Sequence, residues 1–145
     1  MVFDSSGESK LEFGQEGNGE GEFSFPNDVA VDSSGRMYVA DSNNFRIQVF
    51  DAQGQLLGGF TRGGGEAVGF PRGVEIEGDY LYVVDTFGHM VRVYDLSQGA
   101  QPAFAFGGQG LGDGEFNFPN GFALDSTGRL YITDRENNRV QVWSY

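Results

Sequence analysis

Short apolar and alternating runs, separated by polar turn sequences, make up most of the chain. Residues 46–50 (Arg-Ile-Gln-Val-Phe) alternate between polar and apolar side chains, which is the pattern of a half-buried β-strand. Residues 29–31 and 37–40 are apolar runs rich in strand-forming side chains, and the turn sequence Asp-Ser-Ser-Gly at 32–35 separates them. A fourth, weaker apolar run follows at 55–60. Helical spacing is absent over windows of about 11 residues. The pattern therefore predicts an all-β protein with four short antiparallel strands per unit, which we call strands a to d.

This unit is repeated along the chain. A shift of 93 residues aligns residues 13–50 with 106–143 without a gap, and 21 of the 38 aligned positions are identical. A middle copy lies between them, with Gly-Phe-Pro at 69–71 and Tyr-Val-Val-Asp at 82–85. Pro26, Pro71 and Pro119 mark the same point in the three copies and are 45 and 48 residues apart. Four strands in a repeat of this length are typical of one blade of a β-propeller.

The repeated motifs resemble those of the NHL-repeat family. The first copy reads Phe-Ser-Phe-Pro at 23–26, Tyr-Val-Ala-Asp at 38–41 and Asn-Phe-Arg-Ile-Gln-Val-Phe at 44–50. The third copy carries the same motifs at 131–134 and 137–143. The middle copy departs from the pattern, because Gly88 replaces the asparagine and Met90 replaces the arginine. The resemblance implies a β-propeller, usually of six blades, in a family whose members include protein-binding and RNA-binding propellers.

The strand count gives one domain over residues 1–145 with the material of three blades. Residues 27–60 form the first blade and 72–106 the second, whereas 120–143 supply only strands a to c of the third. Residues 1–13 align with 49–60 and supply the end of a strand c and one strand d. Propellers close with about four to eight blades. We therefore expect two chains to close a six-bladed ring around a twofold axis, each N-terminal strand d completing the last blade of the other chain. The alternative is a fragment of a longer protein whose unpaired edges aggregate.

One candidate ligand site lies at the expected mouth of the central channel. Strand a lines the channel of a propeller, and the residues that follow the three prolines, Asn27, Arg72 and Asn120, are expected near its mouth. The d–a and b–c loops share this face. In a twofold ring these amides and guanidinium groups could bind a carboxylate, a phosphate or ordered water. The alternative is that the three side chains cap strand ends.

A second candidate constellation is the aspartate that ends strand b in every copy. Asp41, Asp85 and Asp134 invite a metal or acid–base interpretation, but a motif present in every repeat favours an architectural role. An aspartate at this position can bind the backbone of the following turn. Arg46 and Arg139, five residues further on, can pair with it across the b–c hairpin.

The single histidine offers no catalytic centre at the sequence level. His89 occupies the position of Phe45 and Asn138 in the repeat, so we expect it on an exposed turn. One histidine per chain falls short of the histidine clusters of catalytic zinc sites. We therefore expect no catalytic residues, no metal and no cofactor.

Charge and composition narrow the classes of partner. The 21 acidic and 9 basic residues give a net charge of -12, which disfavours binding to nucleic acid and to anionic membranes. The absence of cysteine excludes disulfides and thiolate metal sites. No signal peptide or membrane span is expected in this sequence.

We therefore expect a non-enzymatic, self-assembling scaffold or binding module, natural and half-length or engineered. Its partners are a second copy of itself and a protein or small molecule on the face of the d–a and b–c loops. The alternative is a small-molecule site, or a lyase- or hydrolase-type enzyme, at the channel mouth.

Overall fold

The computed structural model describes residues 1–61 and 68–144, and this part of the chain contains β-strands and three short 3-10 turns but no α-helix. The strands are β1 (Val2–Phe3), β2 (Ser9–Leu11), β3 (Gln15–Glu16), β4 (Glu22–Phe23), β5 (Pro26–Val31), β6 (Met37–Asp41), β7 (Arg46–Phe50), β8 (Leu56–Thr61), β9 (Pro71–Glu77), β10 (Tyr80–Asp85), β11 (Met90–Asp95), β12 (Gln101–Gly107), β13 (Pro119–Leu124), β14 (Leu130–Asp134) and β15 (Arg139–Trp143). The 3-10 turns are η1 (Ser42–Asn44), η2 (Leu96–Gln98) and η3 (Arg135–Asn137). The all-β prediction is confirmed. None of the described helical turns has the length and apolar character needed to cross a membrane.

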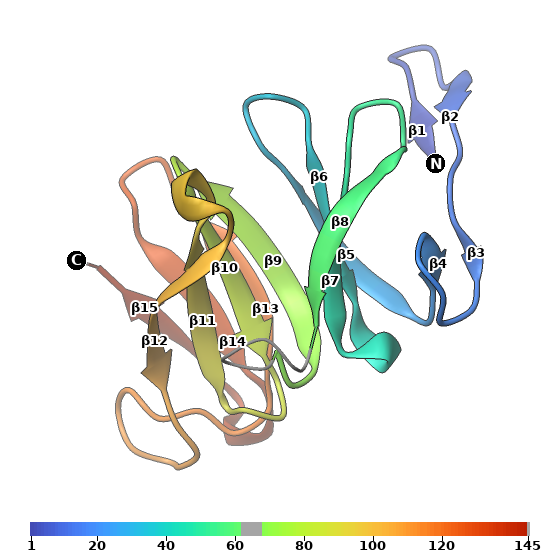
Figure 1. The fold of residues 1–145 in the computed structure, drawn as a ribbon. Helices are drawn as coiled ribbons and strands as arrows, with labels where there is room; N and C mark the ends of the chain where they lie inside the picture. Colours follow the sequence, from blue (N-terminus) through green and yellow to red (C-terminus); the bar gives the residue numbers. More distant parts are fainter. Residues whose placement is uncertain (62–67, 145) are drawn as a thin grey trace.

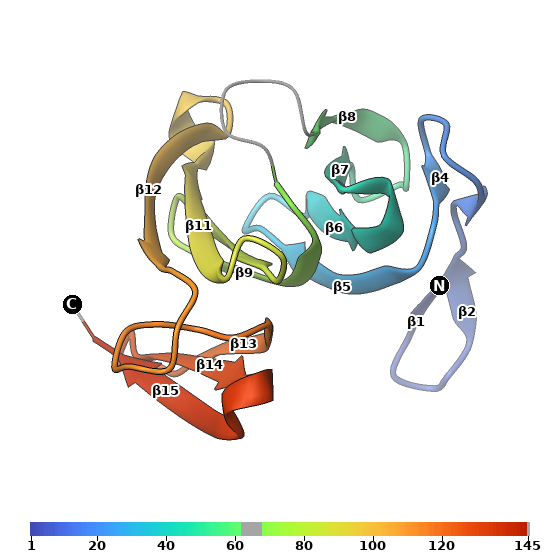
Figure 2. The same cartoon turned by 90° about the horizontal axis from the view of Figure 1, so that it is seen from below.

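Antiparallel meanders form the three main sheets (Figure 1). Sheet 1 has the order β5-β6-β7-β8 and sheet 2 the order β9-β10-β11-β12, so both are the four-stranded antiparallel units that the sequence predicts. Sheet 3 has the order β13-β14-β15, and the outer edge of β15 pairs with no described strand. Seen from below, the sheets follow one another around an arc, with the N-terminal β1–β2 hairpin near sheet 1 at one end and sheet 3 at the other (Figure 2).

The core lies between the faces of neighbouring sheets. Ala40 and Ile47 of sheet 1 pack with Leu81 and Val83 of sheet 2, and all four are fully buried. The opposite face of sheet 2 packs on sheet 3 through a second cluster of apolar side chains, among them Val84, Val91, Leu130 and Ile132. Both faces of sheet 2 are therefore buried, which is possible because successive side chains on a strand point to opposite sides. Burial of one such aliphatic side chain stabilises the fold by about 1.5–3 kcal/mol.

Aspartates close the a–b and c–d turns that the sequence predicts. The Oδ1 atom of Asp32 accepts hydrogen bonds from the backbone N–H groups of Ser34 and Arg36, at 2.9 and 3.0 Å. Burial opposes ionisation of Asp32, but the hydrogen bonds from Ser34 and Arg36 outweigh it and lower the pKa of this carboxyl to about 2. Asp51 closes the c–d turn of sheet 1 in the same way, through the N–H groups of Gln53 and Gln55.

Candidate functional site

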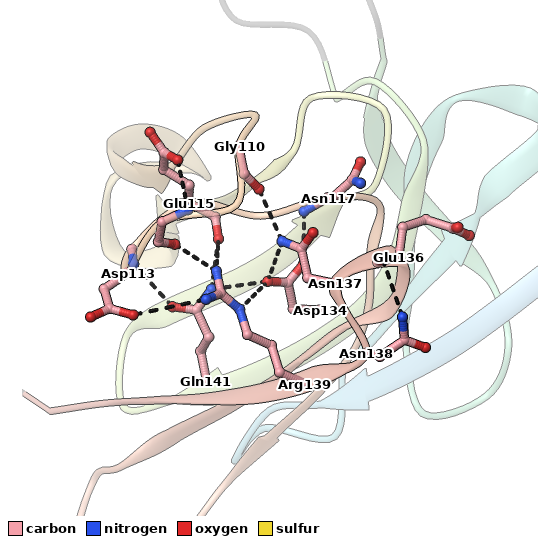
Figure 3. A network of polar contacts seen from close by, with 12 residues as sticks. Gly110, Asp113, Glu115, Asn117, Asp134, Glu136, Asn137, Asn138, Arg139 and Gln141 are labelled. Atoms are coloured by element: carbon pink, nitrogen blue, oxygen red, sulfur yellow. Dashed lines mark hydrogen bonds and ion pairs between the residues drawn. The ribbon is translucent and has the colours of Figure 1, made fainter.

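The aspartate that ends strand b of sheet 3 is the centre of a polar network (Figure 3). Asp134 is fully buried, and its carboxylate accepts a 2.7 Å hydrogen bond from the backbone N–H of Asn117. Three side chains also donate to it: Asn137 Nδ2 at 2.8 Å, Arg139 Nε at 2.8 Å and Gln141 Nε2 at 3.1 Å. Burial alone would raise the pKa of Asp134, but the bonds from Asn117 and Arg139 outweigh it and hold that pKa below its ordinary value.

This network attaches the d–a loop to the b–c hairpin. The Arg139 guanidinium donates to the backbone carbonyls of Gly112 and Glu115, at 2.5 and 2.9 Å. Asn137 Nδ2 also donates to the Gly110 carbonyl, and the Glu115 carboxylate accepts the Gly112 N–H (Figure 3). Both oxygens of Asp134 thus already accept hydrogen bonds, and we interpret the constellation as architectural.

Sheet 1 contains the same arrangement. Asp41 accepts hydrogen bonds from the Ser24 N–H at 2.7 Å, Asn44 Nδ2 at 2.9 Å, Arg46 Nε at 2.7 Å and Gln48 Nε2 at 3.2 Å. Asp41 has no exposed surface. The identical bonding in two sheets that lie 93 residues apart shows that the repeated sequence encodes this geometry.

Sheet 2 reaches the same result with a different arginine. Asp85 pairs with Arg92 Nε at 2.8 Å, although Arg92 occupies the position that glutamine holds in the outer copies. Backbone N–H groups of Gly69, Phe70 and Gly88 supply the other hydrogen bonds to the carboxylate. Sequence comparison noted the loss of arginine at position 90 but missed this substitute two residues later.

The three residues of the expected channel mouth lie on the inner strands of successive sheets, and β5 adjoins β9, which adjoins β13. Asn27 Nδ2 donates to Ser42 Oγ at 2.6 Å, and its Oδ1 lies 3.5 Å from a terminal nitrogen of Arg72. Asn120, on β13, is half-buried. Among the described contacts, Asn120 makes no side-chain hydrogen bond to Asn27 or Arg72. The structure thus brings together two of the three residues.

An aromatic arc, which sequence reasoning missed, lies beside Arg72. We define it as Phe45, Phe70, Phe87 and Phe118. Successive ring centroids are 5.8, 4.5 and 6.2 Å apart, and half of the Phe87 surface is exposed. The Arg72 guanidinium lies 5.0 Å from the Phe70 ring centroid, within the range of a cation–π contact.

His89 belongs to the same region but is buried, so the prediction of an exposed histidine was wrong. Its Nδ1 accepts a 3.2 Å hydrogen bond from the Phe118 N–H, and the two rings lie 4.7 Å apart. The d–a loop that carries Phe118 therefore covers the b–c turn of sheet 2, which repeat spacing could not reveal. Within residues 1–61 and 68–144, no group of three or more His, Asp or Glu side chains is placed to hold a metal ion.

Known solved structures share this fold. Virginiamycin B lyase of Staphylococcus aureus superimposes with a TM-score of 0.64 and 14% identity, covering 97% of this chain and 46% of that one. Streptogramin B lyase superimposes with a TM-score of 0.59 and 11% identity, covering 86% of this chain and 40% of that one. At these identities the likeness shows a propeller-like fold and nothing about activity.

Curated relatives match along much of the chain. Protein brain tumor of Drosophila melanogaster is 30% identical over 136 residues, or 90% of this chain. B-box type zinc finger protein ncl-1 of Caenorhabditis elegans is 33% identical over 136 residues, and human NHL repeat-containing protein 3 is 43% identical over 71. The chain spans only 12%, 15% and 20% of the lengths of the fly, worm and human relatives, respectively.

A family model accounts for the repeated motifs. The NHL repeat model matches residues 23–50 and 116–143, which are the first and third copies of the unit. The middle copy, where Gly88 and Met90 replace the motif residues, lies outside the matched ranges. The repeated Asp–Asn–Arg networks and these matches together show that the chain carries two NHL repeats, at residues 23–50 and 116–143, and that it is similar to NHL-repeat proteins.

Proposed function

We propose that this chain is a non-enzymatic binding scaffold and that two copies close a six-bladed ring. Each copy contributes the blades at 27–60 and 72–106. Strands a to c at 120–143 are completed by residues 1–13 of the partner subunit. The proposal is carried by one observation, namely that the two outer faces of the chain are copies of faces that are buried inside it.

The outer face of sheet 3 exposes valine side chains at repeat positions whose counterparts in sheet 1 are buried. Val140 is 58% exposed, whereas Ile47 at the same repeat position packs against sheet 2 and has no exposed surface. The outer face of sheet 1 shows the converse, because Val29 is 52% exposed and Val74 at the equivalent position of sheet 2 is 3% exposed. Each outer face thus matches one side of the contact between sheets 1 and 2. A second copy supplies the missing side for both faces, which is an isologous arrangement.

Charge introduced on this face tests the ring. Val140→Asp is expected to weaken the dimer roughly 100-fold or more, because closure would bury an unpaired carboxylate. Leu57→Asp is the matched control, since Leu57 is 57% exposed on β8 and lies outside both outer faces. Light scattering after size exclusion should give about 32 kDa for the wild type and the control, twice the chain mass of 15.8 kDa. A wild-type mass of one chain, or a polydisperse mass, would overturn the ring.

A second candidate function is ligand binding at the channel mouth. It is favoured by the incomplete hydrogen bonding of the Arg72 guanidinium. Its Nε atom is buried and has no hydrogen-bond partner in the described structure. The guanidinium has no carboxylate partner among the described ion pairs, although the chain carries a net charge of -12. A carboxylate-bearing small molecule or peptide fits this group, because carboxylates accept paired bonds from guanidinium. The lyase- or hydrolase-type alternative has only the fold likeness behind it.

Arginine side-chain NMR tests this second candidate. Acetate is expected to shift the Arg72 Nε–H resonance with saturation in the millimolar range, while sodium chloride at equal ionic strength leaves it unchanged. Arg72→Ala should remove the resonance and the binding without altering the mass of the assembly. Equal responses to acetate and chloride would show that the mouth has no carboxylate site.

A further inference from the structure

The N-terminal hairpin has the pairing register of a blade's outer hairpin. In sheet 1 the strand partners are Val49 with Gly58 and Phe50 with Leu56, with a bulge between the two pairs. In the N-terminal hairpin they are Val2 with Leu11 and Phe3 with Ser9, with the bulge at the same place. The turns agree as well. The Asp4 N–H donates to the Glu8 carbonyl at 3.0 Å, as the Asp51 N–H donates to the Gln55 carbonyl at 2.9 Å.

Strand d of this hairpin also packs on sheet 1 in the way that strand d of a complete blade packs on the next sheet. A phenylalanine near the end of each strand d packs, with the two rings tilted, against an aromatic residue near the end of strand c of the next sheet. The centroid distances are 4.8 Å for Phe13–Phe50, 4.8 Å for Phe60–Tyr94 and 4.7 Å for Phe106–Trp143. The glycine that follows this phenylalanine is also equivalent in the N-terminal hairpin and in sheet 2.

Gly14 and Gly107 have φ values of +84° and +101°, and an added Cβ atom on either would strike an aromatic ring, that of Phe23 or of Phe116. Residues 9–14 therefore already occupy the place of a strand d beside sheet 1, before any partner is present.

This strand d pairs with only a short part of a strand c. In sheet 2, β12 pairs with β11 from Met90 to Asp95, whereas β2 pairs only with the two residues of β1. Residues 12–14 have no strand partner in the described structure. The outer edge of β15 likewise pairs with none of the described strands. Because Val142 and Trp143 hold the same repeat positions as Val2 and Phe3, β1 and β15 are two versions of one strand end.

We infer that β1 occupies the place beside β2 that belongs to β15 of the partner subunit in the closed ring. When the ring closes, the partner's β15 displaces β1 from β2. This inference rests on the proposed ring and specifies its register. By the pairing of β7 with β8, Val142 of the partner subunit lies opposite Leu11, and Val140 of the partner subunit lies opposite Phe13. The ladder then extends over residues 9–14 and includes the three residues that now lack a partner. The longer ladder favours exchange because each added backbone hydrogen bond contributes to stability.

Disulfide trapping tests the register directly, since the chain has no cysteine of its own. Leu11→Cys and Val142→Cys chains are prepared separately, mixed in equal amounts and mildly oxidised. Residues directly opposite on antiparallel strands are close enough for a disulfide. Intact mass is expected to show a covalent dimer in the mixture and little in either chain alone. The matched control is Leu11→Cys mixed with Val140→Cys, displaced by two residues, which should give a several-fold lower yield. Equal yields from the two mixtures would overturn the register.

A disulfide within the N-terminal hairpin tests whether β1 must leave β2 for the dimer to form. Phe3 and Ser9 are strand partners, so a Phe3→Cys, Ser9→Cys chain can hold β1 on β2 when oxidised. Oxidation is expected to make this variant monomeric, and reduction should restore the dimer. Deletion of residues 1–3 should do the opposite and tighten the dimer by about 10-fold, because it removes the competing strand.

Different results would contradict the proposed ring and the proposed strand exchange. A wild-type chain that is monomeric by light scattering contradicts the ring itself. A dimeric wild type whose mass is unaffected by the hairpin disulfide, and whose affinity is unaffected by the deletion, contradicts strand exchange but leaves the ring standing.

Discussion

Replacement of Asp41 by alanine is expected to lower the free energy of unfolding by about 3–5 kcal/mol, the cost of breaking a buried ion pair. Asp41 has no exposed surface and accepts hydrogen bonds from Ser24, Asn44, Arg46 and Gln48. The variant leaves the Arg46 guanidinium, which is also buried, without its carboxylate. Urea unfolding followed by tryptophan fluorescence and circular dichroism measures the change.

The matched control for this substitution is Asp51→Ala. Asp51 also accepts two backbone hydrogen bonds in a turn, from Gln53 and Gln55, but it is not fully buried and has no described arginine partner. Its loss should cost about 1 kcal/mol. If Asp41→Ala were no more destabilising than Asp51→Ala, the network would not be the architectural element that we take it to be.

The second large effect is expected at Arg92, and it should be reversible by a second substitution. Arg92→Gln gives sheet 2 the glutamine of the outer copies without their arginine, so the buried carboxylate of Asp85 loses its charged partner. We expect a loss of about 3 kcal/mol. Met90→Arg in the same chain restores the arrangement of sheets 1 and 3 and should recover at least half of that loss. A double-mutant cycle from urea unfolding measures the coupling; additive effects would contradict the exchange of roles between positions 90 and 92.

The pH dependence of this loss has a definite sign. Burial opposes ionisation of Asp85, but Arg92 and three backbone N–H groups hold its pKa below the ordinary value. A depressed folded-state pKa contributes stability that is complete above the unfolded-state pKa of about 3.9 and is lost as the pH falls through the folded-state pKa. The difference between wild type and Arg92→Gln should therefore be largest near neutral pH and shrink below about pH 4. A constant difference would exclude the Asp85 charge as its source.

The strands and turns were accessible from the sequence because both are encoded locally. Alternation predicted β7, and the sequence Asp-Ser-Ser-Gly predicted the turn before β6. The role of Arg92 was hidden because repeat alignment compares one position at a time. Residues two apart on a strand project from the same face, so side chains at positions 90 and 92 can reach the same carboxylate. That equivalence appears only when the face is considered as a whole.

Other features depend on contacts between blades. His89 is buried by Phe118, which lies 29 residues away in a different loop. The aromatic arc likewise gathers side chains from loops of different sheets. Each phenylalanine was visible in the sequence, but their proximity follows from the curvature of the array, which short-range patterns do not specify.

The presence of two outer faces on one chain means that the proposed ring is held by two identical seams. The first seam forms between separate molecules, whereas the second closes within the pair, at an effective concentration that short tethers place in the millimolar range. A substitution on one outer face is therefore counted twice in the homodimer, while a mixed ring of wild-type and Val140→Asp chains keeps one seam intact. In the proposed ring, opening of one seam would therefore leave the two chains joined through the other seam.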